Sequence, residues 1–268
     1  MRIYSQNIWG NFSSKECIGN RNFLIHQLIE KYQPDFCCFQ ECNPSTSRKD
    51  NSISILLKDN YDEVLLENEN KNFTPIFYNR NKVKFVCGEY VVYSGLNDWD
   101  SKSFTWGLFE NLENKERVVV ISTHLWWKYT GEVDILQRRE NVKQLMDVVN
   151  SLYLQYEVPI IVCGDFNSGE KAKQGPDAYY QMIKNNMVDV RNLALESSNS
   201  ETCSLEYPKH DSDGVYYQGV QPCITIDYIF VNKEELILAT SFKIDNSQIA
   251  RDSSDHSPLI FEFELKSK

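Results

Sequence analysis

A carboxylate and a carboxamide, Asp165 and Asn167, follow the apolar run 160–163 in the middle of the chain. This run of isoleucines, a valine and a cysteine predicts a short strand that is buried on both faces. Because residues i and i+2 of an extended chain point the same way, both polar side chains would be presented at the carboxyl end of the strand. Sites on α/β scaffolds lie at such ends. Taken alone, an Asp-Xaa-Asn turn after a core strand is the simpler interpretation.

More polar residues stand at or near the ends of other predicted strands. They are Asn7 in 2–8, Glu41 after 36–39, His124 after 117–123, Asp255 and His256 before 259–265, and Asp227 within 223–231. Each has an ordinary structural explanation, but their joint recurrence predicts one common site. Two histidines with several carboxylates and amides, without paired cysteines, suit a hard cation such as Mg²⁺ or Mn²⁺.

Histidines beside such a cation suit acid–base work or stabilisation of charge on a phosphoryl oxygen. The chain contains no nucleophile elbow with a serine and no Walker-type phosphate loop. The residues therefore indicate metal-assisted attack of water on a phosphoester.

The elements that must position these residues alternate along the chain. Helices are predicted at 21–32, 51–58 and 176–187, with a long helix that contains 145–152, and further strands at 61–66, 73–78, 82–93 and 103–110. The polar segment 197–221 is predicted to be a functional or mobile loop. No linker divides the chain, and strand, helix and strand recur in each half, so residues 1–268 are predicted to form a single domain.

Composition limits the partners. Lys and Arg number 28 and Asp and Glu 38, a net charge of −10, which argues against non-specific binding of a nucleic-acid backbone unless a metal ion supplies positive charge. Eight cysteines without a CxxC pair indicate free thiols in a reducing compartment. With neither a signal peptide nor a transmembrane-length segment recognised, a cytoplasmic location is predicted.

The ordered motifs resemble those of the endonuclease/exonuclease/phosphatase superfamily. They are Asn7, Gln40-Glu41, Ser122-Thr123-His124-Leu125, Gly164-Asp165-Phe166-Asn167, Ile226-Asp227-Tyr228-Ile229 and Ser254-Asp255-His256. The resemblance covers almost the whole chain. It implies an α/β fold, a four-layered α-β-β-α sandwich of two mixed β-sheets flanked by helices.

The resemblance also implies roles for these residues. Glu41 would be the principal Mg²⁺ ligand, with Asn7 beside it and Asp255 near the same ion. Asp165 would orient or deprotonate the attacking water, and Asn167 would bind a phosphate oxygen. His256, held in its tautomer by Asp227, would contact the phosphate or act as the base. His124 would stabilise the transition state or protonate the leaving group. The division of base duty between Asp165 and His256 stays open.

The Thr123-His124-Leu125 form is similar to that of sphingomyelinase-like, deadenylase-like and DNase-like members. Trp126 and Trp127, directly after this histidine, are the predicted substrate contacts. The favoured interpretation is a monomeric hydrolase of a small or lipid-derived phosphodiester or phosphomonoester. A DNA or RNA nuclease is the alternative, and it would need a basic stripe; the densest candidate comprises Lys128, Arg138, Arg139 and Lys143. A non-catalytic binding module with the same fold is the third hypothesis.

Overall fold

The protein is built on two mixed β-sheets that pack face to face. The structure, a computed structural model, describes residues 1–10, 15–43, 52–64, 72–204, 207–211, 214–218 and 222–266. Within them the sheets have seven and six strands, and two short two-stranded ribbons complete the β-structure.

The seven-stranded sheet contains both ends of the described chain. Its strands, in spatial order, are β10 (Glu196–Ser197), β16 (Ile237–Ile244), β17 (Leu259–Leu265), β1 (Arg2–Asn7), β2 (Phe36–Gln40), β4 (Ile76–Asn79) and β3 (Tyr61–Glu63). β1 runs parallel to β2 and antiparallel to β17. The first and the last strand of the described chain are therefore neighbours.

The six-stranded sheet comes from the middle of the chain. Its order is β5 (Val83–Val92), β6 (Ser103–Asn111), β7 (Arg117–His124), β8 (Ile160–Asp165), β15 (Asp227–Val231) and β9 (Val188–Asp189). β7 and β8 are parallel, and the remaining pairs are antiparallel.

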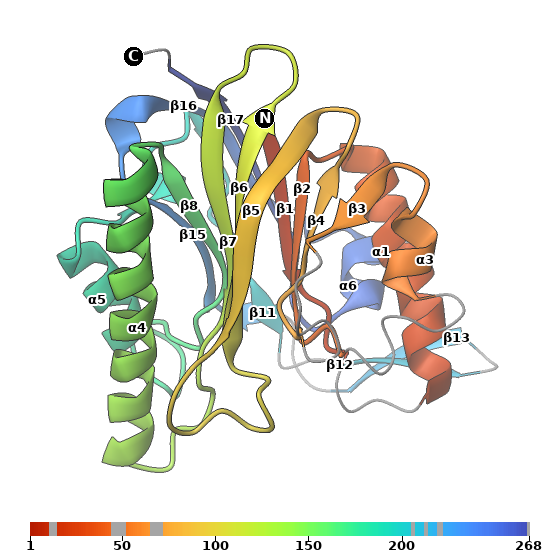
Figure 1. The fold of residues 1–268 in the computed structure, drawn as a ribbon. Helices are drawn as coiled ribbons and strands as arrows, with labels where there is room; N and C mark the ends of the chain where they lie inside the picture. Colours follow the sequence, from red (N-terminus) through yellow and green to blue (C-terminus); the bar gives the residue numbers. More distant parts are fainter. Residues whose placement is uncertain are drawn as a thin grey trace.

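Helices cover the outer face of each sheet (Figure 1). α4 (Glu132–Tyr156) and α5 (Asp177–Lys184) lie on the six-stranded sheet, and α1 (Lys15–Tyr32), α3 (Ile53–Leu57) and α6 (Gln248–Ser253) on the other. Apolar residues of both sheets, such as Ile3 and Phe36 on one and Val118 and Ile161 on the other, form the central core. The predicted four-layered sandwich is confirmed.

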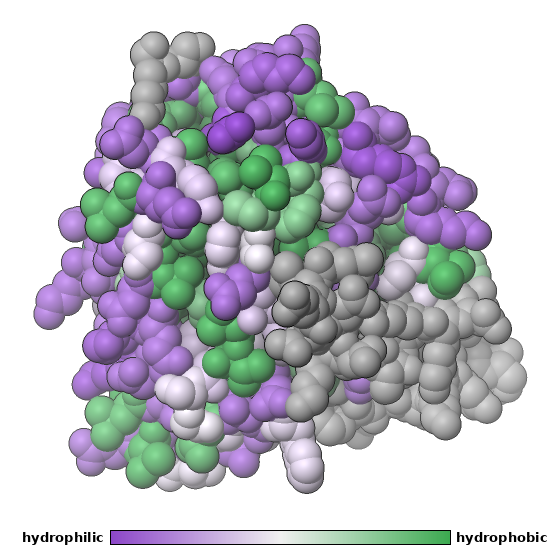
Figure 2. All heavy atoms as spheres, in the orientation of Figure 1, coloured by the Kyte–Doolittle hydropathy of each residue, from purple (hydrophilic) through white to green (hydrophobic). Residues whose placement is uncertain are grey.

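The outward side of α4 is mainly hydrophilic, with separate apolar residues among the polar ones (Figure 2). This is the pattern of a helix with one face on a core and the other in water. None of the described helices combines the length and apolar composition that crossing a bilayer requires.

Several predicted elements differ from the structure. The segment 197–221 holds short strands, among them β11 (Cys203–Ser204) and the antiparallel pair β12 (Tyr207–Asp211) and β13 (Gly214–Gln218). The predicted strand 223–231 is two strands, β14 (Pro222–Ile224) and β15, so Asp227 begins a strand and does not lie within one. β16 and α6 were not predicted, because their mixed polar and apolar residues show no clear period.

Candidate active site

Three of the predicted site residues lie side by side at one edge of the six-stranded sheet. His124 ends β7 and Asp165 ends β8, and the two are paired across these parallel strands. Asp227 begins the antiparallel strand β15 directly opposite Asp165. Strand register therefore brings together three residues that are far apart in the sequence.

Gly164 allows β8 to approach β7 closely next to Asp165. Its φ is +150°, and a Cβ atom there would lie 1.9 Å from the carbonyl oxygen of Thr123. Asn167, two residues after Asp165, has a φ of 47°, and its backbone N–H donates to Oδ1 of Asp165 at 2.8 Å. The expected turn is therefore present, and it also positions Asn167, one of the predicted site residues.

The seven-stranded sheet supplies the other half of the site. Asn7 ends β1, and Glu41 directly follows β2, with a φ of 55°. Nδ2 of Asn7 donates to Oε1 of Glu41 at 3.2 Å and to Oδ2 of Asp165 at 3.0 Å. One amide thus joins carboxylates from the two sheets.

The segment that carries Asp255 and His256 is hydrogen-bonded to β1. Oγ of Ser254 donates to the carbonyl of Asn7 at 2.7 Å, and Nε2 of Gln6 donates to the carbonyl of His256 at 2.9 Å. These bonds place the last motif of the chain beside the first.

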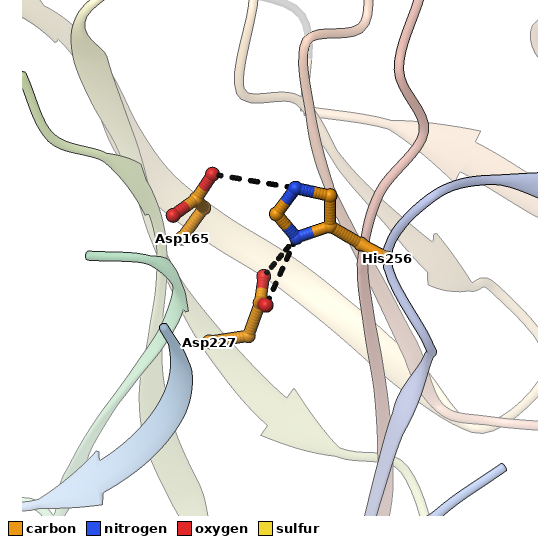
Figure 3. A group of neighbouring side chains, drawn as sticks. All are labelled: Asp165, Asp227 and His256. Carbon is orange, nitrogen blue, oxygen red and sulfur yellow. Dashed lines mark hydrogen bonds and ion pairs between the residues drawn. The ribbon is translucent and has the colours of Figure 1, made fainter. Parts of the chain in front are cut away.

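His256 lies between two carboxylates (Figure 3). Its Nδ1 is 2.9 Å from Oδ2 of Asp227, and its Nε2 is 3.9 Å from Oδ2 of Asp165. Thr202 fixes Asp227 from behind, because its Oγ1 donates to Oδ2 of Asp227 at 2.7 Å. Sγ of the buried Cys203 lies 3.5 Å from Nε2 of His256. The ring is therefore held in one orientation with Nε2 toward Asp165.

The surroundings of Asp165 and His256 shift their pKa values upward. Burial, and next the charge of Asp227, raise the pKa of Asp165 to about 7, although His256 opposes the shift. Burial alone would lower the pKa of His256. The negative charge of Asp227, the weaker effects of Cys203 and Asp255, and the hydrogen bond to Asp227 together outweigh burial and raise the pKa well above its usual value. At neutral pH the site therefore holds a protonated imidazole next to a carboxyl group that titrates near neutrality.

His124 has the opposite character. Burial lowers its pKa well below the ordinary value, and the positive charges of Lys102 and His256 lower it further. Nζ of Lys102 lies 3.1 Å from Nε2 of His124, and Nδ2 of Asn167 lies at the same distance from that nitrogen. His124 is thus a neutral ring with two donors, Lys102 and Asn167, at Nε2, and Oδ2 of Asp165 lies 3.4 Å from the same nitrogen.

These residues open into a cavity of about 810 Å³, within the range of ligand pockets. Glu41, His124, Asp165, Asn167, Asp255 and His256 line its polar part. Aromatic side chains line its solvent side, and we call Trp9, Phe73, Trp99 and Trp127 the aromatic mouth.

The loop before β6 shapes the aromatic mouth. Asp98, Trp99 and Asp100 all have left-handed backbone angles, with φ of 47°, 63° and 69°. Such angles are strained for residues other than glycine and cluster at functional sites. Trp99 is 92% exposed, and the indole N–H of the half-exposed Trp127 donates to the Asp98 carboxylate.

The two predicted tryptophan contacts separate in the structure. Trp127 lines the cavity, but Trp126 does not. Trp126 is only 3% exposed, and its Nε1 donates to Oδ1 of Asp134 at 2.7 Å. Its position is that of a core residue that fixes the loop before α4.

The carboxylates fit a hard divalent cation. Burial raises the pKa of Asp255 to about 6; His256 opposes the shift, and the nearby charge of Glu41 adds to it. In the described part of the chain, no lysine or arginine forms a salt bridge with Glu41, Asp165 or Asp255. A cation held by oxygen ligands would supply positive charge beside these carboxylates.

A second group of residues could also hold a metal ion. It comprises Asp165, Asp227 and His256, whose donor atoms lie within 4.8 Å of one another.

The sequence motifs did not indicate Lys102 or Thr202. Lys102 stands just before β6, whose first residue is paired with His124. A pairing of the predicted strands 103–110 and 117–123 would have placed this lysine at the site edge. Thr202 lies in an irregular segment, and no local sequence signal distinguishes it.

The Endonuclease/Exonuclease/phosphatase family model matches residues 4–256, and the chain belongs to this family. An uncharacterised protein of Acanthamoeba polyphaga mimivirus is 24% identical in an alignment 264 positions long, which covers 91% of this chain and 91% of that protein.

Several solved structures share the fold. A mannosyl-6-phosphatase of Bacteroides thetaiotaomicron superposes with a TM-score of 0.72 at 17% identity, over 99% of this chain and 100% of that chain. The human Nocturnin catalytic domain, solved with a bound sulfate anion, has a TM-score of 0.70 at 20% identity, over 99% and 93% of the chains. TDP2 of D. rerio, complexed with a single-strand DNA product, has a TM-score of 0.66 at 16% identity, over 99% of each chain.

Proposed function

We propose that the protein is a divalent-metal-dependent hydrolase of a small or lipid-derived phosphodiester or phosphomonoester. The observation that carries this proposal is the arrangement of Asp165 and His256. A carboxyl group with a pKa of about 7 lies 3.9 Å from an imidazole with a raised pKa, at the polar end of a ligand-sized cavity. Catalytic acids and bases need pKa values near the working pH.

In this mechanism Asp165 takes the proton of the attacking water while the new P–O bond forms and the ester P–O bond breaks. The leaving oxygen takes up a proton from solvent, and Asp165 later returns its own proton to solvent. His256 is protonated because Asp227 faces its Nδ1, so its Nε2–H donates to a phosphoryl oxygen. The base is thus Asp165, and His256 stabilises charge. Asn167 turns its Nδ2 toward His124 and into the same cavity, where it donates to a second phosphoryl oxygen.

Asn7, Glu41 and Asp255 would hold a Mg²⁺ or Mn²⁺ ion. When bound, such an ion polarises the phosphoryl group and favours ionisation of nearby water. We prefer Asn7, Glu41 and Asp255 as the metal ligands over the group formed by Asp165, Asp227 and His256. Nδ1 of His256 is already engaged by Asp227, and a protonated ring has no lone pair for a metal.

The described surface favours a small substrate over a long polynucleotide. Three of the four residues in the candidate basic stripe are engaged elsewhere. Arg138 is buried and donates to the carbonyls of Lys128 and Gln174, Arg139 pairs with Asp177, and Lys143 pairs with Asp147. The nuclease alternative is supported by the relative that was solved with single-strand DNA. The cytoplasmic location, the monomeric state and the single domain stay predictions.

Turnover of four substrates tests the function. The purified protein is assayed with Mg²⁺, Mn²⁺ or EDTA on p-nitrophenyl phosphate, bis-p-nitrophenyl phosphate, plasmid DNA and an RNA oligomer. We expect metal-dependent hydrolysis of a small ester. Asp165→Ala and His256→Ala should each lower kcat by about 10²–10⁴-fold. His26→Ala, which changes a histidine on α1 that faces Glu30, is the matched control and should be neutral. Equal turnover in EDTA, or cleavage of nucleic acid alone, refutes the proposal.

A pair of tryptophan variants tests the aromatic mouth. Trp127→Ala removes a cavity-lining ring and should raise KM about tenfold for a substrate with an aromatic leaving group. Trp126→Phe removes the indole donor to Asp134 and should lower the thermal midpoint without a change in KM. A KM effect in Trp126→Phe with none in Trp127→Ala would reverse this assignment.

A further inference from the structure

Lys102 is a buried cation inside the cavity. It is only 5% exposed and lines the cavity together with His124, Asp165 and Asn167. Its backbone is fixed on both sides, because its N–H donates to the carbonyl of Asn97 at 3.0 Å and its own carbonyl accepts from the N–H of Tyr93 at 3.0 Å. A lysine is seldom this deeply buried unless its charge has a partner.

Among the residues that the structure describes, no carboxylate contacts the ammonium group of Lys102. Nζ lies 3.1 and 3.3 Å from the two ring nitrogens of His124, and within the described ranges Lys102 forms no salt bridge. Glu41, Asp165 and Asp98 act on it only through longer-range attraction, which opposes the lowering of its pKa by burial. Its charge is therefore left for a group that enters the cavity.

His124 cannot carry that charge itself. Burial and the neighbouring ammonium hold its pKa well below the usual value, so it is neutral in the free protein. The roles that family resemblance implies for His124 are stabilisation of the transition state or protonation of the leaving group. A neutral ring brings no positive charge to the first role, and the adjacent Lys102 can provide one.

We propose that Lys102 is a catalytic residue whose ammonium group binds a phosphoryl oxygen of the substrate beside His124. This inference rests on the proposed phosphoester hydrolysis. A phosphoryl oxygen would restore the solvation that burial removes, and the ammonium would stabilise the negative charge of the transition state. The competing explanation is that Lys102 only balances the acidic cluster and stabilises the fold.

Binding of inorganic phosphate in EDTA separates the two explanations, because it needs neither metal nor turnover. We expect Lys102→Met to weaken phosphate binding, measured by calorimetry at pH 7, at least about tenfold, and Lys102→Arg to recover part of it. In assays with Mg²⁺, Lys102→Met should lower kcat/KM by about 10²–10³-fold. Lys143→Met removes an exposed lysine of α4 and is the control; both its measurements should match the wild type.

Unchanged phosphate affinity in a folded Lys102→Met protein overturns the proposal. If Lys102→Met does not fold, NMR of the wild-type protein with ¹⁵N-labelled lysine provides the test. The Nζ signal of Lys102 is identified as the one that is absent in Lys102→Arg. This signal should shift when phosphate is added, and a signal that does not move overturns the proposal as well. Phosphate binding that depends on Lys102 in a protein without any turnover would support this site and refute the proposed hydrolysis, so the two failures are distinguishable.

Discussion

His124 and His256 share one cavity, yet their neighbours shift their pKa values in opposite directions. A carboxylate faces His256 and a lysine faces His124, and both rings are buried. Burial favours the neutral ring in each case, so the sign of the nearest charge decides the outcome. One histidine is therefore suited to donate a proton or a hydrogen bond and the other to accept one.

The pH dependence of kcat/KM follows from these shifts. Asp165 must be ionised and His256 protonated, so activity should rise with pH through the pKa of Asp165, about 7 without metal, and fall above the raised pKa of His256. A bound cation favours the ionised carboxylate, so saturating Mg²⁺ should move the rising limb to lower pH.

The Asp227→Asn variant provides the check on this profile, measured between about pH 5 and 10. Removing the charge that raises the pKa of His256 should move the falling limb to lower pH. A falling limb that stays in place in this variant would contradict the assignment. Because Asp165 and His256 interact, the pKa values obtained from the pH profile belong to the pair and not to either residue alone.

At the scale of elements, strand ends position the chemistry. Asn7, His124 and Asp165 are the last residues of β1, β7 and β8, and Asp227 is the first of β15. Strand register fixes their backbones more tightly than a loop would, and the close approach at Gly164 sets the spacing of β7 and β8.

Gly164→Ala should therefore abolish activity. Its Cβ would overlap the carbonyl of Thr123, and its φ is unfavourable for alanine, so β8 must move away from β7. Gly131→Ala is the control, since no atom lies within 4 Å of the added Cβ. Thermal unfolding and kcat are measured for both variants. Wild-type stability and activity in Gly164→Ala would show that this contact is not needed.

At the scale of the whole molecule, the site lies across two packed sheets. Asn7 bridges Glu41 and Asp165, and Nε2 of Gln40 donates to Oγ of Ser122 at 3.1 Å from one sheet to the other. Neither sheet alone contains both the predicted metal ligands and the proposed general base, Asp165.

A small opening between the sheets should abolish activity while the strands persist. We therefore expect loss of activity at a lower urea concentration than loss of the far-ultraviolet circular dichroism signal, because catalysis depends on sub-ångström placement. Assays at each urea concentration, corrected for direct inhibition by urea, provide the measurement. Coincident midpoints would mean that sheet packing and strand structure are lost together.

The sequence allowed the fold class and most of the polar site to be predicted, because strand-end residues such as Asp165 and Glu41 fall in a recognisable order. It did not indicate Lys102 or Thr202, because only tertiary contacts bring them next to His124 and Asp227 and they belong to no motif. Trp126 and Trp127 show the same limit. They are adjacent tryptophans, yet Trp126 is buried and Trp127 lines the cavity. The sequence did not predict β16, because this strand lacks a regular apolar period. In the structure it pairs antiparallel with β17.

The strained loop with Asp98, Trp99 and Asp100 has an evolutionary consequence. It forms part of the aromatic mouth, but it contributes none of the proposed base or metal ligands. Mutations that remodel this loop can thus change which leaving group is admitted and leave the hydrolytic residues on their strands unchanged. Exchange of such loops offers a short route by which one scaffold acquires new substrates.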